Sequence, residues 1–174
     1  MTESRSCVLH VAELSDREAL QTLCRTMPVI AAAGAHQVLV DLSANADHDA
    51  CRAAAAGAEL RTLRCRESSM FGKLKALRTE LSGLARERSV HAVHLHGVGA
   101  CLLGARAMKG SVSPARVLCS PHLSSSASPW SGALVARVLR GPLQALRCAG
   151  LAASTMEAQA LSKLLNRCAD ALPH

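Results

Sequence analysis

The chain alternates short apolar segments, rich in branched residues, with longer segments of helical periodicity. The segments typical of buried strands are 7–14, 36–42, 58–63, 90–97, 115–122 and 148–155. The helical segments are 15–34, 46–56, 71–88, 98–110, 130–147 and 156–172. This order predicts parallel strands joined by crossover helices. We therefore expect one domain over 1–174 with an α/β fold: a doubly wound, mostly parallel six-stranded Rossmann-like sheet with helices on both faces.

Local signals refine the first helix. Ser15 and Glu18 have the spacing of a Ser-x-x-Glu capping box, which predicts that the helix begins there. The helix runs toward Gly34, with a bend or an interruption expected near Pro28.

Composition excludes several classes of protein. The net charge of +7 suits an anionic partner, but Phe71 and Trp130 are the only aromatic residues, and single-strand binders stack bases on aromatic rings. Nucleic acid is therefore not expected as a partner. The arginine-bearing helix over 130–147 suits contact with an anionic membrane, although a helix that covers the sheet is the commoner explanation.

The eight cysteines include no Cys-x-x-Cys pair, so the usual zinc and redox spacings are missing. The N-terminus lacks the apolar core of a secretory signal, and no stretch of ~18 apolar residues suits a membrane span. We expect reduced cysteines and a cytoplasmic location, with peripheral attachment to the inner face of the membrane left open.

In a doubly wound sheet, ligands bind beyond the carboxyl ends of the strands. The polar and glycine residues that follow the predicted strands are therefore the candidates for a site. They are Ser15, Asp16, 43–45, 94–99, 120–126, Ser154 and Thr155.

Gly97 and Gly99 follow the fourth predicted strand and open a helix, where a phosphate could approach the helix N-terminus. A dinucleotide fingerprint would need a further glycine at Leu102 and would more usually follow the first strand. A tight strand-to-helix turn that needs small residues is the commoner explanation of the pair.

His94 and His96 alternate along one strand, so both side chains point to the same face. Such a pair can bind metal, but no carboxylate or thiol cluster accompanies it, and no metal site is expected. The plain alternative is that one histidine is buried and hydrogen-bonded while the other lines the ligand crevice.

His122 ends the fifth predicted strand, where an imidazole can exchange hydrogen bonds and protons near neutral pH. Ser124 and Ser125 add hydroxyls suited to sugar or phosphate oxygens. Taken alone, the stretch SPHLSSS is equally consistent with a solvated loop.

Together these segments resemble the N-terminal domain of glycosyltransferases of the GT-B fold, family 4 type. The resemblance is most specific over 89–126, where a His-x-His strand, a small-residue turn into a helix and a strand ending in Pro-His follow one another. The stretches AAAGAHQVLV (31–40) and AGLAASTMEAQAL (149–161) are similar to further family segments.

The resemblance implies that this domain holds the acceptor, while a C-terminal domain, absent from these 174 residues, holds most of the nucleotide-sugar donor. It implies that His122 positions the sugar and the acceptor, and that His94 or His96 lies near the cleft. Ser15, Asp16 and Gly97 are then the other candidates for substrate contacts.

One departure concerns the loop after the first strand, where the family usually has two glycines and this chain has Leu14, Ser15 and Asp16. A carboxylate there opposes a phosphate. Three hypotheses therefore stay open: the acceptor-side half of a retaining glycosyltransferase, which needs no cofactor beyond its nucleotide-sugar substrate; a non-catalytic binding module derived from one; and a small nucleotide-binding Rossmann protein.

Overall fold

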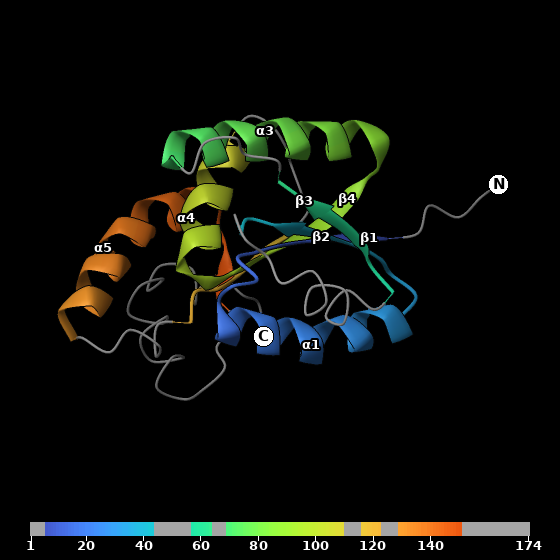
Figure 1. Ribbon diagram of the computed structural model, residues 1–174, viewed down its shortest axis with the longest axis horizontal. Helices are drawn as coiled ribbons and strands as arrows, with labels where there is room; N and C mark the ends of the chain where they lie inside the picture. The colour runs from blue at the N-terminus through green and yellow to red at the C-terminus, as the bar shows by residue number, and fades with distance from the viewer. Residues whose placement is uncertain (1–5, 44–56, 64–68, 110–115, 123–128, 151–174) are drawn as a thin grey trace.

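The computed structural model describes residues 6–43, 57–63, 69–109, 116–122 and 129–150, with the side chains of 137–149 in the last range. The elements are β1 Cys7–Ala12, α1 Arg17–Ala32, β2 His36–Asp41, β3 Glu59–Thr62, α3 Met70–Glu87, β4 Val90–His96, α4 Gly97–Met108, β5 Arg116–Ser120, α5 Pro129–Ala145 and β6 Ala149–Gly150 (Figure 1). The helices predicted over 46–56 and 156–172, and most of the strand predicted over 148–155, lie outside the described residues.

The six described strands form one sheet in the order β3-β2-β1-β4-β5-β6, and every neighbouring pair is parallel. The predicted doubly wound α/β fold is thereby confirmed. From β1 the chain adds β2 and β3 on one side, and it then returns to add β4, β5 and β6 on the other side. The carboxyl ends of β1 and β4 therefore flank the point where such sheets bind ligands.

For α1, the predicted N-cap and an interruption at Pro28 are wrong, while a bend at Pro28 stays a prediction. The N-cap is Asp16, not Ser15: Asp16 Oδ1 accepts hydrogen bonds from the backbone N–H groups of Glu18 (2.9 Å) and Ala19 (3.4 Å). The helix also continues unbroken through Pro28 to Ala32. Pro28 lies on the exposed side of the helix, where water can satisfy the carbonyl that proline leaves without a donor.

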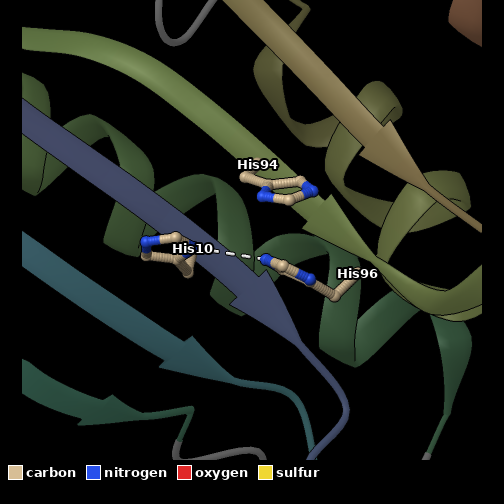
Figure 2. Close-up of side chains that lie close together, drawn as sticks. All are labelled: His10, His94 and His96. Carbon is tan, nitrogen blue, oxygen red and sulfur yellow. Dashed lines mark hydrogen bonds between the residues drawn. The ribbon is translucent and has the colours of Figure 1, made fainter. Parts of the chain in front are cut away.

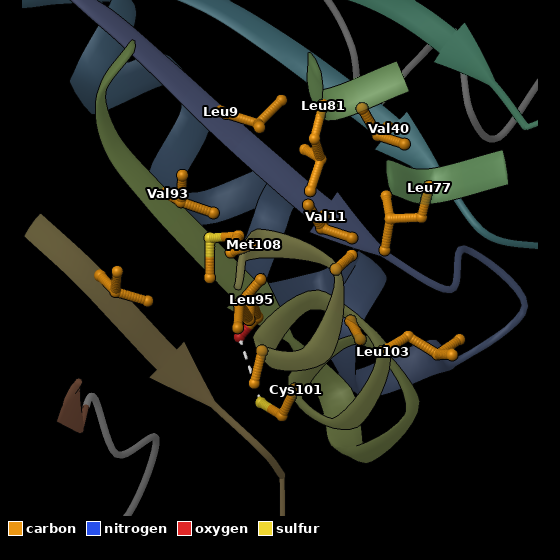
Figure 3. Packing of buried hydrophobic residues seen from close by; sticks show 14 of the residues in the cluster. Leu9, Val11, Val40, Leu77, Leu81, Val93, Leu95, Cys101, Leu103 and Met108 are labelled. Carbon is orange, nitrogen blue, oxygen red and sulfur yellow. Dashed lines mark hydrogen bonds between the residues drawn. The ribbon is translucent and has the colours of Figure 1, made fainter. Parts of the chain in front are cut away.

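One face of the sheet is apolar and is covered by α3, α4 and α5 (Figure 1). Strand residues such as Leu9, Val11 and Val93 are fully buried there. They pack against Leu77 and Leu81 of α3, which have the predicted helical spacing, and against the residues of α4 labelled in Figure 3. This face supplies the main hydrophobic core.

The other face is covered by α1, whose Leu23 and Met27 pack on Ala12 and Leu39. Beside this small apolar cluster, the same face carries an unusual set of buried polar side chains. They are His10, Gln37, Asp41, His94, His96 and Ser120. Burial of polar groups is unfavourable unless they are hydrogen-bonded, so this set marks the place to look for function.

Candidate functional site

Three histidines meet on the α1 side of the sheet, toward the carboxyl ends of β1 and β4 (Figure 2). His10 of β1 is the register partner of His94, and Ala12 is the partner of His96. All three imidazoles therefore point to the same face, and their residues are 0%, 3% and 0% exposed for His10, His94 and His96 respectively. The rings of His94 and His96 lie closest, with centroids 3.7 Å apart.

A chain of hydrogen bonds fixes the tautomers of two of these rings. The Gln37 amide donates from Nε2 to the Met27 carbonyl (2.9 Å), so its Oε1 accepts from Nε2–H of His10 (3.1 Å). Nδ1 of His10 then carries a lone pair and accepts from Nε2–H of His96 at 3.2 Å. By this assignment Nδ1 of His96 also carries a lone pair, which has no hydrogen-bond partner among the described residues.

Burial keeps the cluster neutral. Desolvation lowers the pKa of His10 to about 4, against a smaller opposing effect of the hydrogen bond to Gln37. Desolvation and the charges of His10 and His122 lower the pKa of His94 to about 3. The same causes, together with His94, hold the pKa of His96 well below its usual value. At neutral pH the cluster therefore offers lone pairs and N–H donors, and it does not offer positive charge for an anion.

His122 lies beyond the end of β5 and is 2% exposed. Its backbone has φ 53°, in the left-handed region that non-glycine residues rarely adopt. It is close enough to His94 and His96 to affect their pKa values. Nε2 of His94 is also within hydrogen-bond distance of Ser120 Oγ, 2.9 Å away. Residues from β1, β4 and the end of β5 thus form one buried polar group.

Two carboxylates stand at the N-terminus of α4. A methyl group in place of hydrogen at Gly97 (φ 83°) would lie 3.1 Å from Asp16 Oδ2, and one at Gly99 would lie 3.0 Å from Glu13 Oε2. Glu13 also forms an ion pair with Lys73 Nζ at 3.1 Å. The helix N-terminus that could have held a phosphate therefore faces negative charge instead.

Apart from Gly97, which opens α4, the predicted site residues divide into three groups. His94, His96 and His122 come together and are buried, so the expectation that one of the pair lines an open crevice is wrong. Ser15 and Asp16 lie beyond the carboxyl end of β1, but Ser15 is exposed and Asp16 caps α1. Ser124, Ser125, Ser154 and Thr155 lie outside the described residues.

Sequence reasoning missed His10, Gln37 and Asp41. His10 sits inside an apolar strand, where it looked like an isolated polar residue, and Gln37 follows His36 at the start of another strand. The available signal was the strand order: in a doubly wound sheet the first strand pairs with the fourth, which places His10 beside the His-x-His of β4.

No protein-family model matches the sequence, and no curated protein matches it either. Among solved structures, the fold is similar to one described as a UDP-N-acetylglucosamine 2-epimerase from Listeria monocytogenes, with a TM-score of 0.61, 9% identity and 93% of this chain covered. The chain spans only 42% of that protein. A short-chain dehydrogenase from Streptomyces avermitilis gives a TM-score of 0.52 at 13% identity, covering 96% of this chain and 79% of the dehydrogenase. These likenesses establish a Rossmann-like fold.

Proposed function

We propose that the chain is the acceptor-side domain of a GT-B glycosyltransferase of the family 4 type. It would transfer a sugar from a nucleotide-sugar to a glycan or to a lipid-linked acceptor. A second Rossmann-like domain, on the same or another chain, would bind most of the donor. In this proposal His122 orients the acceptor and hydrogen-bonds the transferred sugar, while His94 and His96 support it from β4.

The observation that carries the proposal is the conformation of His122. A buried histidine held at φ 53° costs on the order of 1 kcal/mol in backbone energy, and such residues cluster at functional sites. His122 follows a strand whose carboxyl end lies at the ligand-binding edge of the fold. The sequence resemblance gives the matching histidine the same role.

The carboxylates of Glu13 and Asp16 support the division of labour between two domains. They stand where a Rossmann domain that binds a nucleotide would receive its phosphates, and like charges repel there. The donor phosphates are therefore better held by the other domain. A small nucleotide-binding protein, the third hypothesis, is disfavoured by the same two residues.

Membrane contact through 130–147 stays a prediction. In the described part of α5, Leu139 and Leu143 are buried, while Arg137 and Arg140 are exposed, as is Arg147 just beyond the helix. The two buried leucines therefore already pack against the sheet, and the exposed side that a membrane would meet carries these arginines together with Val138. No described helix is long and apolar enough to cross a membrane.

Calorimetric titration with nucleotides and nucleotide-sugars tests the division of labour. We expect no binding to the wild-type chain. Replacing Glu13 and Asp16 together (Glu13→Gln, Asp16→Asn) removes both charges while the Asn keeps the helix cap, and we expect this variant to gain weak affinity for inorganic phosphate. Micromolar binding of a nucleotide by the wild type would overturn the proposal in favour of a complete nucleotide site.

Acceptor binding tests the role of His122. We would screen free oligosaccharides and a short-chain prenyl-linked sugar by chemical-shift mapping. His122→Asn keeps a residue that tolerates the left-handed backbone but removes the imidazole, and it should lose the binding. His91→Asn, on β4 but outside the cluster, is the control. Acceptor binding that survives His122→Asn, or no binding by wild type to any probe, would contradict the proposal.

Turnover separates the first hypothesis from a non-catalytic module. If acceptor binding is found but no sugar is transferred when a matching donor-binding domain is supplied, the chain is a binding module. Transfer that requires His122 establishes the enzyme.

A further inference from the structure

We propose that His10, His94 and His96 form a binding site for a borderline divalent metal ion of the zinc class. One ring nitrogen from each residue lies within 4.8 Å of the other two. The three rings come from adjacent strands of a sheet and converge on one buried point (Figure 2). This inference is independent of sugar transfer.

One pair of ring nitrogens already has the right spacing. Two nitrogen ligands bound at ~2.0–2.1 Å in a tetrahedron lie about 3.3 Å apart. His10 Nδ1 and His96 Nε2 are 3.2 Å apart, with one proton between them. A metal ion would replace that proton, which can move to Nδ1 of His96. The ring nitrogen of His94 lies within 4.8 Å of the other two, so it must move closer by at most about 1.5 Å to reach the same tetrahedral edge.

The residues behind the rings match what metal-binding histidines require. A ligating imidazole usually donates its other N–H to an oxygen, which fixes the ring and its tautomer. Gln37 Oε1 accepts that bond from Nε2 of His10, and Ser120 Oγ lies 2.9 Å from Nε2 of His94. Nδ1 is thereby left as the ligand atom of both His10 and His94.

Asp41 carries a buried carboxylate on the same face, outside the three-histidine group, and would offset part of the charge of a bound dication. It is 0% exposed and is the register partner of Ala12, whose other partner is His96. Asp41 and His96 therefore flank the small side chain of Ala12 on the same face of the sheet. Asp41 Oδ1 accepts from the backbone of Leu14 and Ser43, but Oδ2 has no hydrogen-bond partner among the described residues.

These groups define the class of ion. Neutral imidazoles favour zinc, copper, nickel or cobalt over magnesium or calcium, which prefer oxygen ligands. Three protein nitrogens leave one tetrahedral position for water or a ligand oxygen, which is the pattern of open rather than purely structural zinc sites.

The first test is titration of the EDTA-treated full-length chain with Zn²⁺, followed by X-ray absorption at the zinc edge. We expect one ion per chain with a first shell of nitrogen and oxygen at ~2.0–2.1 Å. The cysteines make this readout necessary, because thiolate ligands would appear at ~2.3 Å. A sulfur-containing shell, or no stoichiometric binding, would overturn the proposal.

Substitutions at the site, together with spectra of the wild-type protein, locate the ion. His10→Gln should weaken Zn²⁺ binding by at least tenfold, Gln37→Leu by roughly 10–100-fold as a supporting residue, and the control His91→Gln should leave the affinity unchanged. If a buried variant fails to fold, nitrogen-15 spectra of the wild-type imidazoles decide. Zn²⁺ should shift the signals of His10, His94 and His96; shifts at other histidines only, or at none, would refute the site.

Discussion

Gly104 sets how closely α4 can approach β4, and its replacement by alanine gives a sharp test of the packing. In a helix interior, alanine is favoured over glycine by about 0.5–1 kcal/mol. A methyl group at Gly104, however, would lie 2.5 Å from Cδ2 and 3.3 Å from Cδ1 of Leu95. Leu95 is 0% exposed, and because protein interiors are close-packed we expect its side chain to have little space into which it can rotate.

Overpacking of this kind costs about 1–3 kcal/mol. After the gain in helix propensity is subtracted, we expect Gly104→Ala to destabilise the protein by about 1 kcal/mol. Gly83 of α3 is the matched control, because a methyl group there meets nothing within 4 Å. Gly83→Ala should therefore stabilise by about 0.5–1 kcal/mol, which makes a difference of about 2 kcal/mol between two identical substitutions.

Urea unfolding of both variants measures this difference. A double-mutant cycle then identifies the cause: Leu95→Val removes the δ-methyl groups, so it should relieve the Gly104→Ala overlap with a coupling energy of about 1 kcal/mol. If Gly104→Ala stabilises the protein as much as Gly83→Ala does, the close approach of α4 to β4 is wrong. The placement of the Gly97–Gly99 turn against Glu13 and Asp16 would then also be in doubt.

Three further predictions concern the cap of α1 and the histidine cluster. Asp16→Ala should cost about 1 kcal/mol of unfolding free energy, because α1 loses its N-cap, while Asp16→Ser should recover most of it; equal urea midpoints for all three proteins would refute the cap. In EDTA, the metal-free protein should lose about 2 kcal/mol between pH 7 and pH 5 through His10: its folded pKa of about 4 keeps it neutral in the native state, whereas the unfolded chain takes up the proton below about pH 6.5. This loss of unfolding free energy should be absent at and above pH 7, should grow as the pH falls toward 4, and should be smaller in His10→Gln. If the unfolding free energies of the wild type and of His10→Gln fall equally with pH, the prediction is contradicted. Gln37→Leu leaves Nε2–H of His10 buried without its acceptor and should cost about 1–3 kcal/mol in urea unfolding, so an unchanged midpoint would show that the hydrogen-bond chain is not as described.

The order of the described strands and helices was predictable because each element is set by local periodicity and by the apolar character of its own residues. The strand over 90–97 and the helix over 71–88 were predicted within one residue of their observed bounds. Helix caps were less predictable. Ser15 and Asp16 both suit an N-cap, and the path of the backbone after β1 determines that Asp16 takes this position.

The sequence by itself also placed His94 and His96 on one face, because side chains along a strand alternate with a period of two residues. It put His122 at the end of a strand, because the length of the apolar segment marks where that strand ends. The tertiary structure alone decided the rest. Parallel pairing of β1 with β4 joined His10 to two residues 84 and 86 positions away, and pairing with β2 added Gln37 and Asp41. Register between distant strands depends on how the whole sheet buries its two faces, and no local pattern encodes which isolated polar residues will meet there.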